Sequence, residues 1–583
     1  MLHTLTRSLR ENKGPALVTV LLSALEVVFE IVIPLFMSNL IDFGIEGGSM
    51  AAVWKFGAFL LLLAAFQLAI GVLAARIAAR ASVGFAANLR EDMYNNVQTF
   101  AFSNIDKFST ASIVTRLTTD TTNVQNAFQM LMRMAIRAPV MLIFSMIVSF
   151  RISRDISMTF LIILPILALA LFFIIRSVFP VFSRVFRTYD ELNNVVQENV
   201  RGIRVVKSFN QERHEIGKFG AISARIYQDF SKGERLITLN APLMQFCIYT
   251  CMIVISWLGA KAIIASGNDP ALGLTTGNLT ALITYTMQIL SSLMMLSMVF
   301  AMLTISLSSA RRIAEVLEER SDIPQPEQPV MTVRNGAVDF DHVSFVYASK
   351  ADKKVLDDID LHIRSGETIG IIGGTGASKS SLVQLIPRLY DVTGGKLTLG
   401  GVDVRDYDLD TLRGAVAMVL QKNELFSGTI AENLRWGNEN ATDEQLRHAC
   451  KLACADEFIS AMPDGYDTHI EQGGTNVSGG QKQRLCIARA LLKKPKVLIL
   501  DDSTSAVDTR TDAQIQQALS TYIPDTTKII IAQRISSVQN ADRIVVLDDG
   551  RIDAVGSHDE LLRSCEIYRE VYESQQKGGE DDA

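Results

Sequence analysis

The segment IGIIGGTGASKSS, residues 369–381, decides the fold of the C-terminal half of this 583-residue chain. Ile369–Ile372 is apolar and predicts a short buried strand, and Leu382–Ile386 predicts a helical stretch. A glycine-rich loop between a strand and a helix points backbone N–H groups at phosphate oxygens. We therefore predict a phosphate-binding loop made of Gly373, Gly374, Thr375, Gly376, Ala377, Ser378, Lys379, Ser380 and Ser381.

Two side chains of this loop carry the expected chemistry, and a third departs from the usual pattern. Lys379 supplies a cation to the β- and γ-phosphates of a nucleotide, and the Ser380 hydroxyl is a ligand for Mg²⁺. Ser378 stands where the usual G-x-x-x-x-G-K-[ST] pattern has glycine. Its Cβ lies where the backbone approaches the ligand, which leaves two possibilities, a weakened nucleotide site and an unaltered one.

Two segments further along the chain complete the set. Lys496–Leu500 (KVLIL) predicts a buried strand that ends at Asp501, where a carboxylate can orient the Mg²⁺ shell. Val477–Gln481 reads VSGGQ and lies between the two phosphate motifs, followed by Lys482-Gln483-Arg484. Found in this order, the three segments support one another as motifs of one nucleotide-binding domain.

Together these segments resemble an ATP-binding-cassette (ABC) exporter half, the type in which six membrane spans precede the cassette. VSGGQ is similar to the family signature LSGGQ, and the resemblance covers essentially the whole chain. It implies ATP and Mg²⁺ as cofactors, with Ser380, Gln421 and Asp501 at the metal. The further nucleotide-site residues that it implies are Tyr347, which would stack on adenine, and Ser478, Gly479, Gly480, Gln481 and Asp508.

Several of these residues also have a purely structural interpretation. Tyr347 could pack beside an edge strand, and Gln421, which resembles the glutamine at the membrane-domain joint, could be a solvated loop residue. Ser478–Gln481 could be a helix-capping turn. Ser505-Ala506-Val507-Asp508 matches the loop that follows the second acidic motif in the family.

Two catalytic positions depart from the family pattern. Asp502 stands where the family has the glutamate that polarises the attacking water, and it is shorter by one methylene, roughly 1.5 Å. Gln533 follows the predicted strand Lys528–Ile531, where the family has the histidine that touches the γ-phosphate. We expect a heterodimer whose other chain has Glu and His at these positions and is completed by the Ser478–Gln481 signature. A homodimer with two equal, slow sites is the alternative.

Long apolar runs dominate the chain before about Arg312, and six of them are candidate spans, although the third, even with its preceding turn, is shorter than the roughly 20 residues that a span needs. The segments 76–137 and 176–235 hold seven and eleven Lys/Arg, so the positive-inside rule places them, the N-terminus and the cassette in the cytoplasm. These segments have helical periodicity, with turns expected at Gly202 and Ser109–Thr110. Arg133, Arg137 and Pro139 interrupt the third run. The predicted spans are Ala16–Leu40, Phe56–Ala75, Ala138–Phe150, Met158–Ile175, Ile237–Leu258 and Leu279–Leu307.

The predicted fold class is an α-helical six-span transmembrane domain with long cytoplasmic helical extensions, fused to an α/β P-loop ATP-binding cassette domain. We expect a transmembrane domain over 1–320, a proline-containing linker over 321–332, the nucleotide-binding domain over 333–575 and a disordered tail over 576–583. The hydrophobic fraction of 48% suits an integral plasma (inner) membrane protein, and the net charge of −6 argues against nucleic acid. The six cysteines include no C-x-x-C pair and indicate structural roles.

The membrane half offers two hints about cargo. Glu26 and Glu30 share one helix face in the first span, where a carboxylate is costly unless it faces the protein interior or a wet cavity. They could attract cationic cargo or bind a neighbouring helix. Met287, Met294 and Met298 in the sixth span suit either an adaptable pocket or a core. These features favour hydrophobic, cationic, multidrug-like cargo, with a lipid or peptide translocator and an ATP-gated channel or sensor as alternatives.

Overall fold

The computed structural model describes residues 1–270, 273–347, 354–502 and 507–580. The chain divides into two compact units. One contains Met1–Gln98 and Thr110–Glu319, and the other contains Thr99–Ser109 and Arg320–Ala583. The short segment Thr99–Ser109 therefore belongs to the same unit as the cassette, although it lies in the sequence between the second and third spans.

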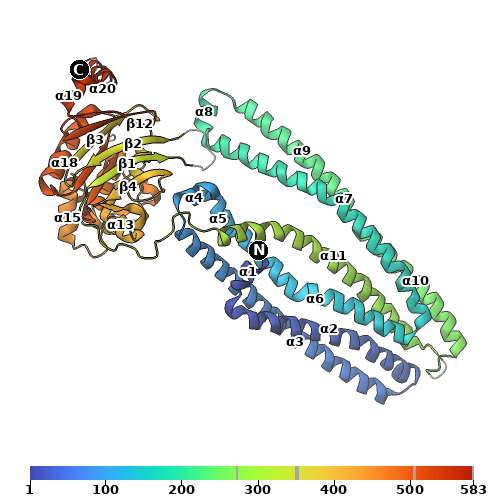
Figure 1. Ribbon diagram of the computed structural model, residues 1–583. Coiled ribbons are helices and arrows are strands. Elements are labelled where there is room, and N and C mark those ends of the chain that lie inside the picture. The colour runs from blue at the N-terminus through green and yellow to red at the C-terminus, as the bar shows by residue number, and fades with distance from the viewer. Residues whose placement is uncertain (271–272, 348–353, 503–506, 581–583) are drawn as a thin grey trace. The chain divides into compact units, whose positions relative to one another are not determined.

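The first unit is built of long helices that lie side by side (Figure 1). The closest pairings are α2 with α3, α6 with α11, and α7 with α9. Short 3₁₀ and π turns, η1 (Arg10–Asn12), η2 (Leu40–Glu46) and η3 (Arg116–Asp120), continue some of them. The helices are α1 (Leu2–Arg7), α2 (Lys13–Asn39), α3 (Met50–Gln98), α5 (Thr110–Thr115), α6 (Thr121–Ile152), α7 (Arg154–Arg201), α8 (Ile203–Ser208), α9 (Glu212–Thr238), α10 (Asn240–Ser266) and α11 (Thr276–Glu318).

Six helical stretches of the described chain are long and apolar enough to cross a membrane, which confirms the predicted number. A 49-residue helix such as α3 is about 70 Å long, more than twice the hydrocarbon thickness of a bilayer. The helices therefore extend well beyond the membrane, as the periodic polar segments predict. The six stretches are Arg10–Glu46, Met50–Gln98, Thr110–Ile152, Arg154–Arg201, Glu212–Ser266 and Thr276–Phe300.

Both predicted turns occur. Gly202 ends α7, and Ser109, with a left-handed φ of 53°, ends α4 (Phe102–Phe108). The third span differs from expectation, because α6 runs unbroken through the interrupting arginines and Pro139. Proline is tolerated inside membrane helices where neighbouring groups satisfy the freed backbone. Arg137 is tolerated inside α6 because it forms the ion pairs described below.

The cassette unit contains a six-stranded sheet of order β12-β11-β3-β10-β9-β6, a four-stranded antiparallel sheet of order β2-β1-β4-β5 and a small β7-β8 pair. In the larger sheet β11, β3, β10, β9 and β6 are parallel, and every residue of β9 and β10 is buried. Burial on both faces explains why these strands are continuous apolar runs. The strands are β1 (Val338–Phe345), β2 (Leu356–Ile363), β3 (Thr368–Gly373), β4 (Gly394–Leu399), β5 (Val402–Asp403), β6 (Val416–Val419), β7 (Gly428–Thr429), β8 (His469–Ile470), β9 (Val497–Asp501), β10 (Thr527–Ile531), β11 (Arg543–Asp548) and β12 (Arg551–Gly556).

The helix α4 is bound to the cassette through Tyr390. Its Asp106 carboxylate accepts a 3.0 Å hydrogen bond from the Tyr390 hydroxyl, and the Phe102 ring lies 6.0 Å from the Tyr390 ring. The other helices of this unit are α12 (Lys379–Gln384), α13 (Leu409–Ala415), α14 (Ile430–Arg435), α15 (Asp443–Leu452), α16 (Asp456–Ser460), α17 (Gly479–Leu492), α18 (Thr509–Tyr522), α19 (His558–Ser564) and α20 (Glu566–Glu580).

The C-terminal segment, in which we expect disorder from residue 576, contains the end of helix α20 at Glu580. The helix is amphipathic and buries Tyr568, and the Gln576 side chain donates a 2.6 Å hydrogen bond to the Tyr572 hydroxyl one turn earlier. Residues 581–583 lie outside the described residues.

Candidate functional site

The phosphate loop joins β3 to α12 and is open above its glycines. A Cβ added at Gly374 or Gly376 would meet no protein atom within 4 Å. Gly376 has a φ of 89°, a left-handed value that favours glycine. The Lys379 ammonium donates hydrogen bonds to the carbonyl oxygens of Gly373, at 2.8 Å, and Gly374, at 2.9 Å. The loop therefore leaves room for an anion beside a cation that burial partly desolvates.

Ser378 has an unusual backbone conformation. Its φ of 66° is left-handed, which gives a second physical reason why the usual pattern has glycine at this position. A serine there costs about 1–2 kcal/mol in backbone strain before any nucleotide is bound.

Replacing Ser378 with glycine should stabilise the cassette by about 1 kcal/mol and tighten ATP binding by about threefold, because strain and a Cβ are removed together. Thermal unfolding and nucleotide titration of the full chain measure the two effects. Lys494→Gly is a matched control, since Lys494 is also left-handed, with a φ of 50°. It should gain stability alone. A Ser378→Gly chain that gains neither would show that the serine is unstrained.

Two of the predicted metal ligands, Ser380 and Asp501, meet at the end of β9. Asp501 is 4% exposed. Burial raises the pKa of Asp501, the neighbouring Ser380 hydroxyl and Lys379 oppose this rise, and Asp502 adds to it. Burial also lowers the pKa of Lys379, which the two aspartates partly offset. A hydroxyl and a carboxylate side by side are the hard oxygen ligands that Mg²⁺ prefers, so these residues fit the ion.

Asp502 lies at the centre of a second cluster. Its Oδ2 accepts hydrogen bonds from Gln421 Nε2, at 3.2 Å, and from Gln533 Nε2, at 2.9 Å. Asp502 is 9% exposed, and its backbone N–H donates to the Ile531 carbonyl, which fixes it to the end of β10. The structure thus brings both departing positions, Asp502 and Gln533, into contact. One carboxylate oxygen is engaged by two amide donors, which leaves it fewer lone pairs for a water proton.

Tyr347 both packs and remains accessible. Its ring meets the rings of Phe345 at 4.8 Å and Tyr390 at 5.0 Å, edge to face in each case, and its hydroxyl lies 2.8 Å from Ser381 Oγ. The residue is 45% exposed. The packing interpretation therefore describes one side of the ring, and the other side is open beside the phosphate loop.

The signature residues begin α17. The Ser478 hydroxyl accepts a hydrogen bond from the Gln481 backbone N–H at 3.3 Å, and Gln481 Oε1 accepts one from the Ser478 N–H at 2.9 Å. This reciprocal pair is a capping box, so the capping interpretation is realised. Ser478 is nevertheless exposed, as is Asp508, which caps α18 through the Thr511 N–H at 2.9 Å. Ser505 and Ala506 lie outside the described residues.

In the membrane unit, Glu26 and Glu30 share one cation. Arg137 donates to Glu26 Oε1 at 2.9 Å and to Glu30 Oε2 at 2.6 Å. The Gln288 side chain donates to the Glu30 carbonyl at 3.2 Å, and a Cβ at Gly71 would lie 3.3 Å from the Glu26 carboxylate. The cluster links α2, α6 and α11. Sequence reasoning missed Arg137 as the partner, although a lone arginine in an apolar run is itself a signal, because buried charges pair.

The three methionines of the sixth span that suit a pocket or a core are exposed in this chain. Met287, Met294 and Met298 are 44%, 43% and 64% exposed. The core interpretation therefore does not hold within the single chain, and these side chains are available to lipid, to a partner chain or to a bound molecule.

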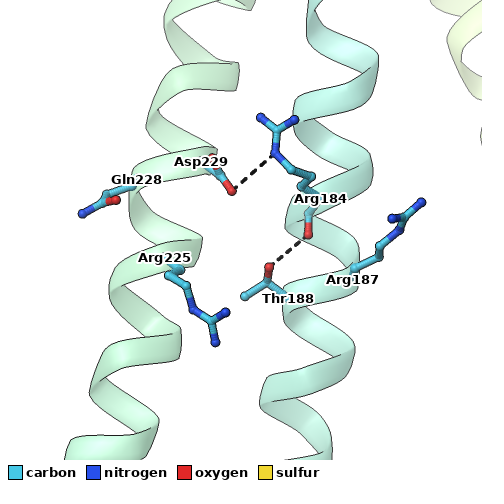
Figure 2. Close-up of a pocket in the computed structure, with 6 residues that line it drawn as sticks. All are labelled: Arg184, Arg187, Thr188, Arg225, Gln228 and Asp229. Carbon is cyan, nitrogen blue, oxygen red and sulfur yellow. Dashed lines mark hydrogen bonds and ion pairs between the residues drawn. The ribbon is translucent and has the colours of Figure 1, made fainter.

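A groove of about 280 Å³ between α7 and α9 carries no separate chemistry. Figure 2 shows Arg184 directed at Asp229, 3.8 Å away, across the gap between the helices. Arg225 pairs with Glu191 at 2.7 Å. Arg184 and Arg225 thus have acidic partners, and the packing of α7 on α9 accounts for these two ion pairs. The lining residues are Arg184, Arg187, Thr188, Arg225, Gln228 and Asp229.

Membrane-crossing helices joined in one chain to a phosphate-loop cassette define a membrane ATPase. Residues 16–294 match the family described as ABC transporter transmembrane region, and residues 356–505 match the family described as ABC transporter. The Bacillus subtilis protein named uncharacterized ABC transporter ATP-binding protein YfiB is 35% identical over 558 residues, 96% of each chain. The Mycobacterium tuberculosis protein Rv1273c, also named an uncharacterized ABC transporter ATP-binding protein, is 33% identical over 580 residues, 99% of this chain and 98% of its own.

The chain belongs to the ABC transporter family, whose members couple ATP hydrolysis to transport. Its fold is also that of a solved structure, a bacterial Atm1-family ABC exporter with ATP bound. The TM-score is 0.82 and the identity 24%, over 97% of this chain and 99% of the other. It is an integral membrane protein with one membrane region and one cassette, a half-transporter in a family that works as dimers.

Proposed function

We propose that this chain is the degenerate-site subunit of a heterodimeric ATP-driven exporter. The observation that carries the proposal is the state of Asp502, whose carboxylate is one methylene shorter than glutamate and whose Oδ2 is engaged by Gln421 and Gln533. General-base catalysis requires that a carboxylate reach the attacking water and accept its proton. Both requirements are impaired here, while the signature at Ser478 is exposed and intact.

The roles of this chain's residues follow from that asymmetry. Lys379 and the backbone of residues 373–378 bind the phosphates, Ser380 and Asp501 with Gln421 hold Mg²⁺, and Tyr347 offers its open face to adenine. When bound, Mg²⁺ neutralises phosphate charge. The site holds ATP and turns it over slowly. Ser478–Gln481 and the start of α17 complete the nucleotide site of the partner, which supplies its own glutamate and histidine.

For the cargo we propose hydrophobic or amphiphilic molecules, moved out of the cytoplasm across the inner membrane, with the cassette on the cytoplasmic side. The exposed Met287, Met294 and Met298 would form an adaptable apolar surface. Glu26 and Glu30 outnumber Arg137, so one negative charge of the cluster is uncompensated when both carboxylates are ionised. That charge favours a cationic group on the cargo.

The purified chain alone should hydrolyse ATP slowly, and co-purification with its partner should raise turnover by about a hundredfold, the size of a general-base contribution. Steady-state ATPase rates in detergent or nanodiscs measure this. A robust rate from the isolated chain that Asp502→Ala abolishes would instead show two equal sites, as in a homodimer.

A further inference from the structure

The C-terminal helix α20 is hydrogen-bonded to the segment that carries Gln533. Gln575 Nε2 donates a 2.7 Å hydrogen bond to the Gln533 carbonyl, and Gln575 Oε1 accepts a 2.9 Å hydrogen bond from the Ile535 N–H. One side-chain amide thus uses both its donor and its acceptor on main-chain groups two residues apart. This arrangement fixes the backbone on both sides of Arg534.

Helix α20 is anchored to the cassette by the residues that precede Gln575. Tyr568, two turns before Gln575 on α20, is 0% exposed, and its hydroxyl lies 2.7 Å from His558 Nδ1. Val571 and Tyr572 pack on the core of the larger sheet. The helix is therefore anchored along the face that precedes Gln575, and the Gln575 amide is held at a defined height beside the loop after β10.

The contact continues into the nucleotide site. The side chain of Gln533, whose carbonyl Gln575 holds, donates a 2.9 Å hydrogen bond to Asp502 Oδ2. Gln533 is otherwise an exposed loop residue, and an unrestrained glutamine side chain would lose rotamer freedom on making that bond. Fixing the backbone from α20 lowers the number of conformations available to the residue.

We infer that Gln575 is a positioning residue of the nucleotide site, through which the C-terminal helix sets where the side chain of residue 533 points. Both hydrogen bonds of Gln575 go to the main chain, so they position whichever side chain stands at residue 533. Its functional consequence rests on the proposed function, with residue 533 at the position from which the family's histidine touches the γ-phosphate.

The test uses the full chain purified on its own, so that no partner site contributes to turnover, in which Asp502→Glu and Gln533→His restore the family residues. Adding Gln575→Leu should lower kcat about tenfold and leave KM for ATP within about twofold, because the histidine is misplaced and binding is not. Gln576→Leu is the matched control, since Gln576 bonds only to the Tyr572 hydroxyl among the described contacts. An equal kcat for the two leucine variants would overturn the inference.

A second measurement tests the two hydrogen bonds of Gln575 in the otherwise unaltered chain. Hydrogen exchange of the Ile535 amide should accelerate about tenfold in Gln575→Leu, while Ile529–Ile531 in β10 keep their protection. If the restored residues bring no turnover, the proposed function fails, and the exchange result still decides the inference. Unchanged exchange at Ile535, or a general loss of protection across the cassette, would reject a positioning role.

Discussion

Ser478→Ala should lower the ATPase rate of the assembled transporter about a hundredfold or more, whereas Asp502→Ala should lower that rate by less than about threefold. The Ser478 hydroxyl is exposed at the start of α17 and serves the intact site of the partner. Asp502 belongs to the site in which two glutamines already engage it. Gly480→Asp should act like Ser478→Ala, because it adds a negative charge where phosphate must approach.

The alanine also removes a helix cap, which costs about 1 kcal/mol of stability. Thr442→Ala is a matched control, because Thr442 and Gln445 form the same reciprocal capping box at the start of α15. That variant should lose similar stability and keep its ATPase rate. Equal losses from Ser478→Ala and Asp502→Ala would mean that the two sites are equivalent, and the asymmetric account would fail.

Arg137→Met should be the most destabilising single change in the membrane unit, by about 3–5 kcal/mol, because it leaves Glu26 and Glu30 without a partner. The double change Glu26→Gln with Glu30→Gln should also destabilise, since it leaves Arg137 unpaired. Changing all three residues to neutral ones should recover most of the loss, because no unpaired charge remains. Thermal unfolding in detergent ranks the three proteins.

The neutral triple variant also separates the two roles open to Glu26 and Glu30. If the cluster attracts cationic cargo, the variant should export a neutral dye normally and a cationic analogue several-fold more slowly. Equal export of both dyes would assign the carboxylates to helix packing alone. A melting temperature near wild type is the condition for comparing the dyes.

Much of the fold follows from the sequence because its signals are local. The apolar runs long enough to span a bilayer give the six spans, and β3, β9 and β10 lie within one residue of the apolar segments that predict them. Gly202 ends a helix as predicted. Such features depend on hydrophobic periodicity and turn chemistry, which neighbouring residues determine.

The remainder depends on contacts between distant residues. Arg137 looks like an interruption until Glu26 and Glu30 are brought beside it from another helix. The grouping of Thr99–Ser109 with the cassette depends on contacts such as that of Asp106 with Tyr390. The role of Gln575 has no local signal at all, because an exposed glutamine near a chain end is ordinary. The roles assigned to the nucleotide-site residues stay predictions.

The most direct test of the asymmetric account is to identify the nucleotide that this chain holds during turnover. The assembled transporter is incubated with Mg²⁺ and α-labelled azido-ATP, crosslinked and separated into its subunits, and the label on each subunit is analysed for ATP and ADP. If the two sites are asymmetric, this chain should carry intact ATP and its partner should carry mostly ADP. The same proportion of ADP on this chain as on the partner would contradict asymmetric sites. So would ADP on a transporter that contains only this chain.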